Sequence, residues 1–138
     1  MRPLLRLLAL VLAAAIGGCG QAASSAGDFK GGEKDVAEVI EELQTAAQSR
    51  KPEDICSEVL SRRLADGLKT ADGDCVDAMD KVTGDADDFE LDVTAVTITG
   101  ATATARVKAR KGGKDNVLTS YTLAREDGKW RLTSLGSS

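Results

Sequence analysis

Ala101-Thr-Ala-Thr-Ala-Arg-Val-Lys-Ala-Arg110 alternates small apolar residues with polar ones from end to end. Successive side chains of a β-strand point to opposite faces, so this period of two places one apolar face against a core and one polar face in water. The stretch predicts a half-buried strand. The outer face would carry Thr102, Thr104, Arg106 and Lys108.

Two neighbouring segments are suited to pair with this strand. Residues 89–98 also alternate, but the apolar phase changes at Ala95–Val96, which predicts a β-bulge there. The alternation returns from Val117 to Leu123, and the Glu126-Asp127-Gly128-Lys129 that follows is typical of a tight hairpin turn. Trp130 and Leu132 would close the sheet. We therefore expect an antiparallel meander of about four strands.

The segment before the strands has helical periodicity. From Glu33 the apolar residues follow the three-and-four spacing of an amphipathic helix. Pro52 is suited to start a second helix, and Ser61 and Asp74 are suited to cap two short ones. The apolar positions are Val36, Val39, Ile40, Leu43 and Ala47, then Ile55, Cys56, Val59, Leu60 and Leu64, then Cys75, Val76, Met79 and Val82. Helices ahead of an antiparallel sheet predict an α+β fold, with N-terminal helices packed on one face of a curved sheet.

The N-terminus has the features of an export signal. Arg2 and Arg6 precede the apolar run Leu7–Cys19, which is too short to cross a bilayer comfortably as a permanent helix. Ile16-Gly17-Gly18-Cys19 resembles a bacterial lipobox, in which the cysteine receives a diacylglyceryl group and its new amine is often acylated, for example with palmitate. The resemblance implies a signal peptide at 1–18, a lipid on Cys19 and a location on the extracytoplasmic side of the cell membrane. An ordinary secretory signal with a chance cysteine is the alternative.

The rest of the chain divides into a tether and one domain. Residues 19–32 are small, polar and glycine-rich, which predicts a flexible tether, and Phe29 is the one tether residue suited to dock on the domain. We expect residues 33–138 to form a single domain. The net charge of −4 becomes −6 once the two arginines leave with the signal peptide. Phosphate backbones and anionic headgroups repel such a domain, so we expect no nucleic-acid partner and attachment to the membrane through acyl chains alone.

The chain has three cysteines and no histidine. With Cys19 assigned to lipid, Cys56 and Cys75 remain as an even pair in an oxidising compartment, which predicts a structural disulfide. A redox-active or metal-binding pair is the alternative, but there is no Cys-x-x-Cys. The acidic residues at 72–88 invite a calcium site, yet their spacing places no glycine at the sixth loop position. We expect a solvated acidic loop, and neither metal nor cofactor.

Residues Lys34 to Leu135 resemble the nuclear transport factor two-like (cystatin-like) cone fold found in small actinobacterial lipoproteins. The resemblance rests on the opening helix, the Arg50–Cys56 segment that starts the second helix, Cys75 in the next one, and the closing hairpin Leu123–Leu132. It implies a cone-shaped sheet, pairing of the two cysteines and Trp130 packed against the cone. The family includes isomerases, dehydratases and binding modules, so the fold does not settle the function.

Tyr121 and Trp130 are the candidate walls of an apolar ligand site. Enzymes with a cone fold use an Asp, Glu or His base with a Tyr donor. Here histidine is absent, and Tyr121 is the only tyrosine. We interpret Tyr121 as a packed core residue with its hydroxyl at a rim, and Trp130 as a core plug that a half-open cone would offer to an apolar ligand. No residue is assigned a catalytic role.

The sequence thus predicts a membrane-anchored, extracytoplasmic and non-enzymatic domain that binds a partner protein or a small apolar ligand. An isomerase or dehydratase in the same cone is one alternative, and an accessory structural subunit is another. A deep apolar cavity holding an inward carboxylate would favour catalysis. A cone filled by side chains would instead leave the outer face of the sheet as the contact surface.

Overall fold

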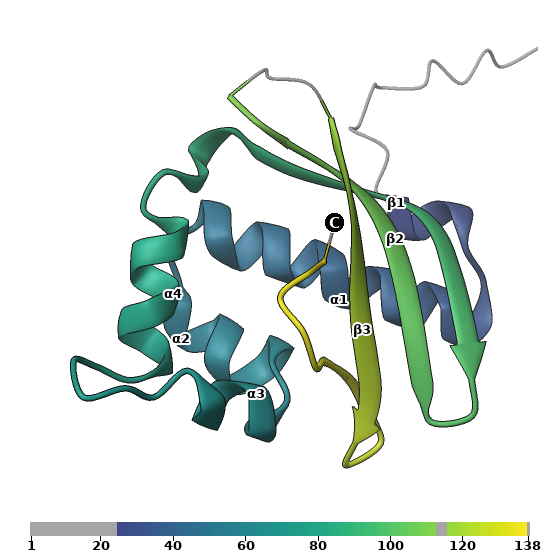
Figure 1. The fold of residues 1–138 in the computed structure, drawn as a ribbon. Coiled ribbons are helices and arrows are strands. Elements are labelled where there is room, and N and C mark those ends of the chain that lie inside the picture. Colours follow the sequence, from purple (N-terminus) through teal and green to yellow (C-terminus); the bar gives the residue numbers. More distant parts are fainter. Residues whose placement is uncertain (1–24, 113–115, 138) are drawn as a thin grey trace, which may run out of the picture.

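A computed structural model describes residues 25–112 and 116–137. Helices fill the first half of this part of the chain and a sheet the second (Figure 1). The elements are η1 (Ser25–Asp28), α1 (Gly31–Gln48), α2 (Pro52–Asp54), the π-helix η2 (Ile55–Val59), α3 (Arg62–Gly67), α4 (Cys75–Thr83), η3 (Ala86–Asp88), β1 (Phe89–Thr99), β2 (Thr102–Lys111), β3 (Val117–Glu126) and β4 (Lys129–Leu132). The predicted α+β fold is confirmed.

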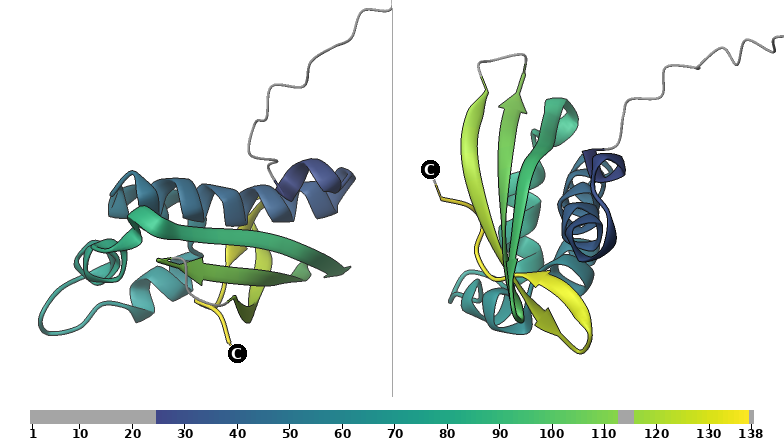
Figure 2. Two further views of the ribbon diagram at one scale, coloured as in Figure 1. Left: turned by 90° about the horizontal axis from the view of Figure 1, so that it is seen from above. Right: turned by 90° about the vertical axis from the view of Figure 1, so that its right-hand side faces the viewer.

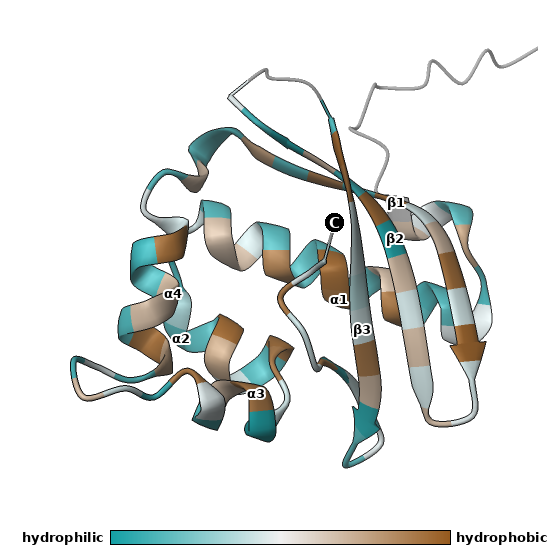
Figure 3. Cartoon of the chain, in the orientation of Figure 1, coloured by the Kyte–Doolittle hydropathy of each residue, from teal (hydrophilic) through white to brown (hydrophobic). Residues whose placement is uncertain are grey.

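The sheet is an antiparallel meander in the order β1-β2-β3-β4. The register between β1 and β2 shifts between Val93 and Ala95, next to the predicted bulge. Gly100, Asp127 and Gly128 have positive φ angles, which the two tight turns require. Apolar and polar residues alternate along the strands (Figure 3). Ala103, Ala105 and Val107 of β2 are buried, so the predicted apolar face of this strand is its core face.

Helix α1 lies along one face of the sheet (Figure 2). All five apolar positions predicted for this helix are buried. Both predicted caps are present: the Ser61 hydroxyl accepts from the Leu64 amide, and the Asp74 carboxylate accepts from the amides of Val76 and Asp77. These bonds satisfy amide donors that a helix start leaves without intrahelical partners.

The predicted second helix is broken into α2 and η2. The Leu60 amide donates to the Ile55 carbonyl at 2.9 Å, so the last turn is one residue wider than an α-helical turn. After it Leu60 bridges to Leu132, and the Ser61 amide donates to the Leu132 carbonyl at 2.8 Å. The wide turn therefore ends in an extended segment that covers the β4 edge of the sheet.

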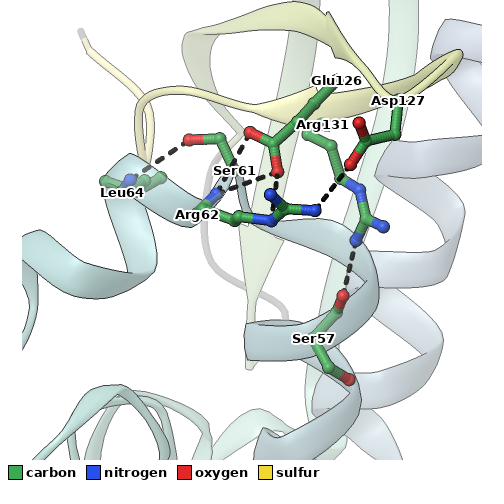
Figure 4. Close-up of polar contacts among 7 residues, drawn as sticks. All are labelled: Ser57, Ser61, Arg62, Leu64, Glu126, Asp127 and Arg131. Atoms are coloured by element: carbon green, nitrogen blue, oxygen red, sulfur yellow. Dashed lines mark hydrogen bonds and ion pairs between the residues drawn. The ribbon is translucent and has the colours of Figure 1, made fainter.

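Side chains reinforce this junction between the helices and the last hairpin (Figure 4). The Arg62 amide donates to the Glu126 carboxylate at 3.2 Å, and the Arg62 guanidinium contacts Asp127 at 2.6 Å. Arg131 donates to the Ser57 carbonyl at 2.6 Å. The β3–β4 turn is thereby tied to η2 and to the start of α3.

The Cys56–Cys75 disulfide is confirmed. It joins η2 to the first residue of α4, and the two Cα atoms lie 6.1 Å apart. Cys75 is buried in the core, as is Met79 one turn later. The crosslink therefore holds α4 against the other helices.

The domain begins earlier than the sequence predicts. Ala26 is only 2% exposed, and its amide donates to the Glu41 carboxylate at 2.8 Å. Phe29 packs against the core, as expected. Residues 25–32, assigned to the tether from sequence, are thus docked on the domain, whereas residues 1–18, Cys19 and the rest of the tether lie outside the described residues. In the described part of the chain no helix is both long enough and apolar enough to span a bilayer.

Two residues predicted on apolar faces are exposed instead. Val82 is 68% exposed because α4 packs through Cys75, Met79 and Thr83, which repeat every fourth residue and leave Val82 beside their stripe. Val117 is 54% exposed although it shares the strand phase of Tyr121 and Leu123. It stands at the first position of β3, beyond the stretch of that strand that packs into the core.

Candidate ligand pocket

An apolar pocket of about 160 Å³ lies between the helices and the core face of the sheet. Its walls come from α1, η2, α4, η3, the end of the β1–β2 ladder, β3 and the C-terminal segment. The lining residues are Leu43, Ala47, Ile55, Met79, Val82, Thr83, Ala86, Phe89, Lys111, Tyr121 and Leu135. An apolar cavity of about 150 Å³ is known to take up benzene, so this pocket suits one ring or an aliphatic group of similar size.

Apolar side chains at the mouth remain exposed to solvent. Val82 and Leu135 both line the pocket, and Leu135 is 41% exposed. Such residues gain free energy when a ligand covers them, because their apolar surface is removed from water. Both the mouth and the interior of the pocket are therefore suited to contact a ligand.

Tyr121 is one of the residues that line this pocket. It is 7% exposed, and burial raises the pKa of its phenol above the ordinary value of 10.0. Among the described residues the hydroxyl has no hydrogen-bond partner, yet its oxygen is not one of the fully buried unpaired polar atoms. The hydroxyl therefore remains able to bond to water or to a ligand.

The C-terminal segment closes the pocket beside Tyr121. The amides and carbonyls of Ser120 and Ser137 pair in both directions, at 2.9 and 3.0 Å. Gly136, with φ of +92°, crosses so close that a Cβ there would lie 2.6 Å from the Thr119 methyl and 3.5 Å from the Tyr121 ring. Only a glycine allows this approach, and the approach sets Leu135 at the mouth.

Lys111 supplies the one cationic group among the described residues of the lining. It pairs with Phe89 in the β1–β2 register and ends β2, so its side chain lies on the same strand face as the buried Val107. In the described part of the chain it makes no ion pair. Within residues 25–112 and 116–137, no lining residue is an Asp, Glu or His.

Trp130 does not line this pocket. It is buried at the opposite end of β3, where it pairs with Arg125 next to the hairpin turn. The Arg125 guanidinium lies 4.9 Å from the centre of the indole ring, a cation–π contact. The indole Nε1 has no hydrogen-bond partner in the described residues. Of the two candidate walls, the structure places Tyr121 at the pocket and Trp130 away from it, as a core plug.

The acidic parts of the chain form no comparable site. A larger groove of about 430 Å³ between α1 and η2 is lined by exposed or half-buried carboxylates, from Glu38, Glu41, Glu42, Asp54 and Glu58. In the loop around residue 74, Asp74 and Asp77 bond to each other's backbone amides in a capping box. No group of three or more potential ligands in the described residues is arranged to hold a metal ion.

The outer face of the sheet is polar, as predicted. Thr102, Arg106 and Lys108 are exposed and Thr104 is half-buried. Asp92 stands opposite Lys108, and Glu90 pairs with Arg110. Opposite charges therefore face each other across β1 and β2, which leaves no strongly charged patch on these two strands.

Comparisons with known proteins add no family to these observations. Neither a protein-family model nor a characterised protein matches the sequence. The pocket must therefore be judged by its own chemistry. Lys111 and Leu135, which stand at its mouth, carry no sequence signal for this role, because only the strand register and the path of the last residues bring them there.

Proposed function

We propose that this domain binds a small apolar ligand on the extracytoplasmic side of the cell membrane, to which a lipid on Cys19 anchors it. One observation carries the ligand proposal: an apolar pocket of about 160 Å³ with exposed apolar side chains at its mouth. In the part of the lining that the structure describes there is no carboxylate and no imidazole, which supports binding rather than an isomerase or dehydratase reaction. The proposal concerns a binding protein that releases its ligand unchanged.

The docked N-terminal segment bears on how the anchor would work. Five residues separate Cys19 from Ser25, where the described domain begins. A fully extended chain advances at most about 3.6 Å per residue, so this segment would hold the domain within about 20 Å of the lipid. A ligand that partitions into the bilayer surface would then be close to the pocket.

The anchor and the pocket are tested separately. Cys19→Ser should move the protein from the membrane fraction to the soluble fraction, and retention of this variant without a labelled acyl chain would contradict the anchor. For the pocket, ligand-observed NMR with benzyl alcohol should show saturable binding to the purified full chain.

Ala47→Leu provides the discriminating variant for the pocket. Ala47 is 2% exposed and lines the pocket, so a leucine there should fill the space and abolish the binding of benzyl alcohol. The matched control is Ala101→Leu, the same change at an exposed position of the β1–β2 turn. Binding that survives Ala47→Leu would place the probe elsewhere and refute the proposed pocket.

A further inference from the structure

Lys111 differs in its surroundings from the cations near it. Arg110, the preceding residue, pairs with Glu90, and Arg50 pairs with Asp87 at 3.2 Å. Lys111 makes no ion pair within the described residues although the whole chain is acidic. Arg110 and Arg50 are thus paired with carboxylates, whereas Lys111 has no ion-pair partner within residues 25–112 and 116–137.

The sign of the charge at the pocket is therefore opposite to that of the chain. Among the lining side chains that the structure describes, the only ionic group is an ammonium, set next to apolar walls. A charge beside a low-dielectric wall attracts an opposite charge more strongly than the same charge in open water. An anionic ligand headgroup would meet this ammonium at the mouth of the pocket.

We propose that the ligand is a small amphiphilic acid: one apolar group of about the size of a benzene ring, joined to a carboxylate that pairs with Lys111. This inference rests on the proposed function and adds the ligand's charge to it. The cavity volume limits the apolar part, because a long acyl chain exceeds the space that a single ring fills. Tyr121 contributes its ring as a wall, and its unpaired hydroxyl can donate a hydrogen bond to a further oxygen of such a ligand.

The test compares three probes that share one ring and differ in charge: benzoate, benzyl alcohol and benzylamine. Each is titrated by ligand-observed NMR against the purified full chain in phosphatidylcholine nanodiscs, with empty nanodiscs as the blank. Benzoate should bind about three- to tenfold more tightly than benzyl alcohol, and benzylamine more weakly than either. Raising the salt concentration should shrink the preference for benzoate, because the ion pair is accessible to solvent.

Two variants assign the preference to one side chain. In Lys111→Met the preference for benzoate over benzyl alcohol should disappear, so that both probes bind this variant with equal affinity. Lys108→Met makes the same charge change on the opposite face of the same strand and should leave all three probes unaffected.

The outcomes separate this inference from the proposed function. Equal binding of the three probes, or an equal effect of Lys108→Met and Lys111→Met, would overturn the acidic ligand while leaving an apolar pocket. Failure of all three probes to bind, or their binding to the Ala47→Leu variant, would overturn the pocket itself and the acid with it.

Discussion

Loss of the Cys56–Cys75 disulfide should strongly destabilise this domain. The two residues are 19 positions apart, and the segment between them contains the rest of η2, the buried Val59, Leu60 and Ser61, the short helix α3 and an exposed turn. A crosslink that closes a loop of this length stabilises the folded state by about 3 kcal/mol in the chain-entropy model. The double variant Cys56→Ala/Cys75→Ala should lose about that free energy of unfolding.

The corresponding fall in melting temperature follows from the size of the domain. Unfolding entropy scales with chain length, and a domain of roughly 110 residues loses about 4 °C in Tm for each kcal/mol. We therefore expect a decrease of about 12 °C. Trp130 is the only tryptophan of the chain and is 6% exposed, so its fluorescence reports unfolding by heat or urea.

Reduction of the wild-type protein is the matched control. A reductant should lower the wild-type Tm by nearly the amount that the double variant loses, and it should leave the double variant unchanged. A loss of less than about 1 kcal/mol in both experiments would refute the assignment of this stability to loop closure, because the chain-entropy model gives three times that value. A variant that still responds to reductant would contradict the disulfide itself.

Three other predictions concern single side chains. The absorbance of tyrosinate should titrate above pH 10 in the folded protein, since burial raises the pKa of Tyr121. The contribution of this residue to the free energy of unfolding is complete below pH 10 and decreases as the pH rises toward the folded pKa. Tyr121→Phe should remove this decrease in stability. Gly136→Ala should cost about 1–2 kcal/mol, because φ is +92° and the new Cβ meets the Thr119 methyl, and it should return the Tyr121 pKa toward 10; an unchanged pKa would contradict closure of the pocket by the C-terminal segment. Asp74→Ala should lower the free energy of unfolding by about 1 kcal/mol in urea titrations, because it removes the N-cap of α4. Asp72→Ala in the same loop should have little effect. Equal losses in the two variants would show that the cap does not stabilise the domain.

The features that the sequence predicts well are those that depend on local residue patterns. The period of two in Thr102–Lys111 defines the core face of β2, and the change of phase near Ala95 locates the bulge. Ser61 and Asp74 are caps because a short polar side chain before a helix bonds to its first amides. Each of these signals depends on a few consecutive residues, so the rest of the chain does not override it.

The features that the sequence misses depend on distant contacts. Residues 25–32 look like a tether by composition, yet Ala26 is buried because its amide reaches Glu41, fifteen residues away. The π-helical turn at η2 is set by the pairing of Leu60 with Leu132 on the last strand, which no helical periodicity reveals. Lys111 likewise reads as a turn residue until the register with Phe89 places it at the pocket.

The pocket exists because small side chains meet where larger ones would fill the space. Ala47 of α1 and Ala86 of η3 both line it, and the disulfide holds α4, with Met79, on its other side. Unfilled apolar volume costs up to about 24 cal/mol per Å³, which for this pocket is at most about 4 kcal/mol. The crosslink stabilises the folded state by about 3 kcal/mol, so it offsets much of the free-energy cost of the unfilled pocket.

One substitution in the pocket should therefore raise the stability of the domain and abolish ligand binding together. Ala47→Leu adds apolar atoms to an unfilled space, so the free energy of unfolding should rise by about 1 kcal/mol in urea titrations followed by Trp130 fluorescence. Ala37→Leu is the matched control, since Ala37 is fully buried on the same helix and lines no described pocket. There the added atoms should clash and destabilise by about 1–3 kcal/mol. If both substitutions destabilise the domain equally, the space beside Ala47 is not available to a ligand, because a pocket that can accept a ring can also accept a leucine.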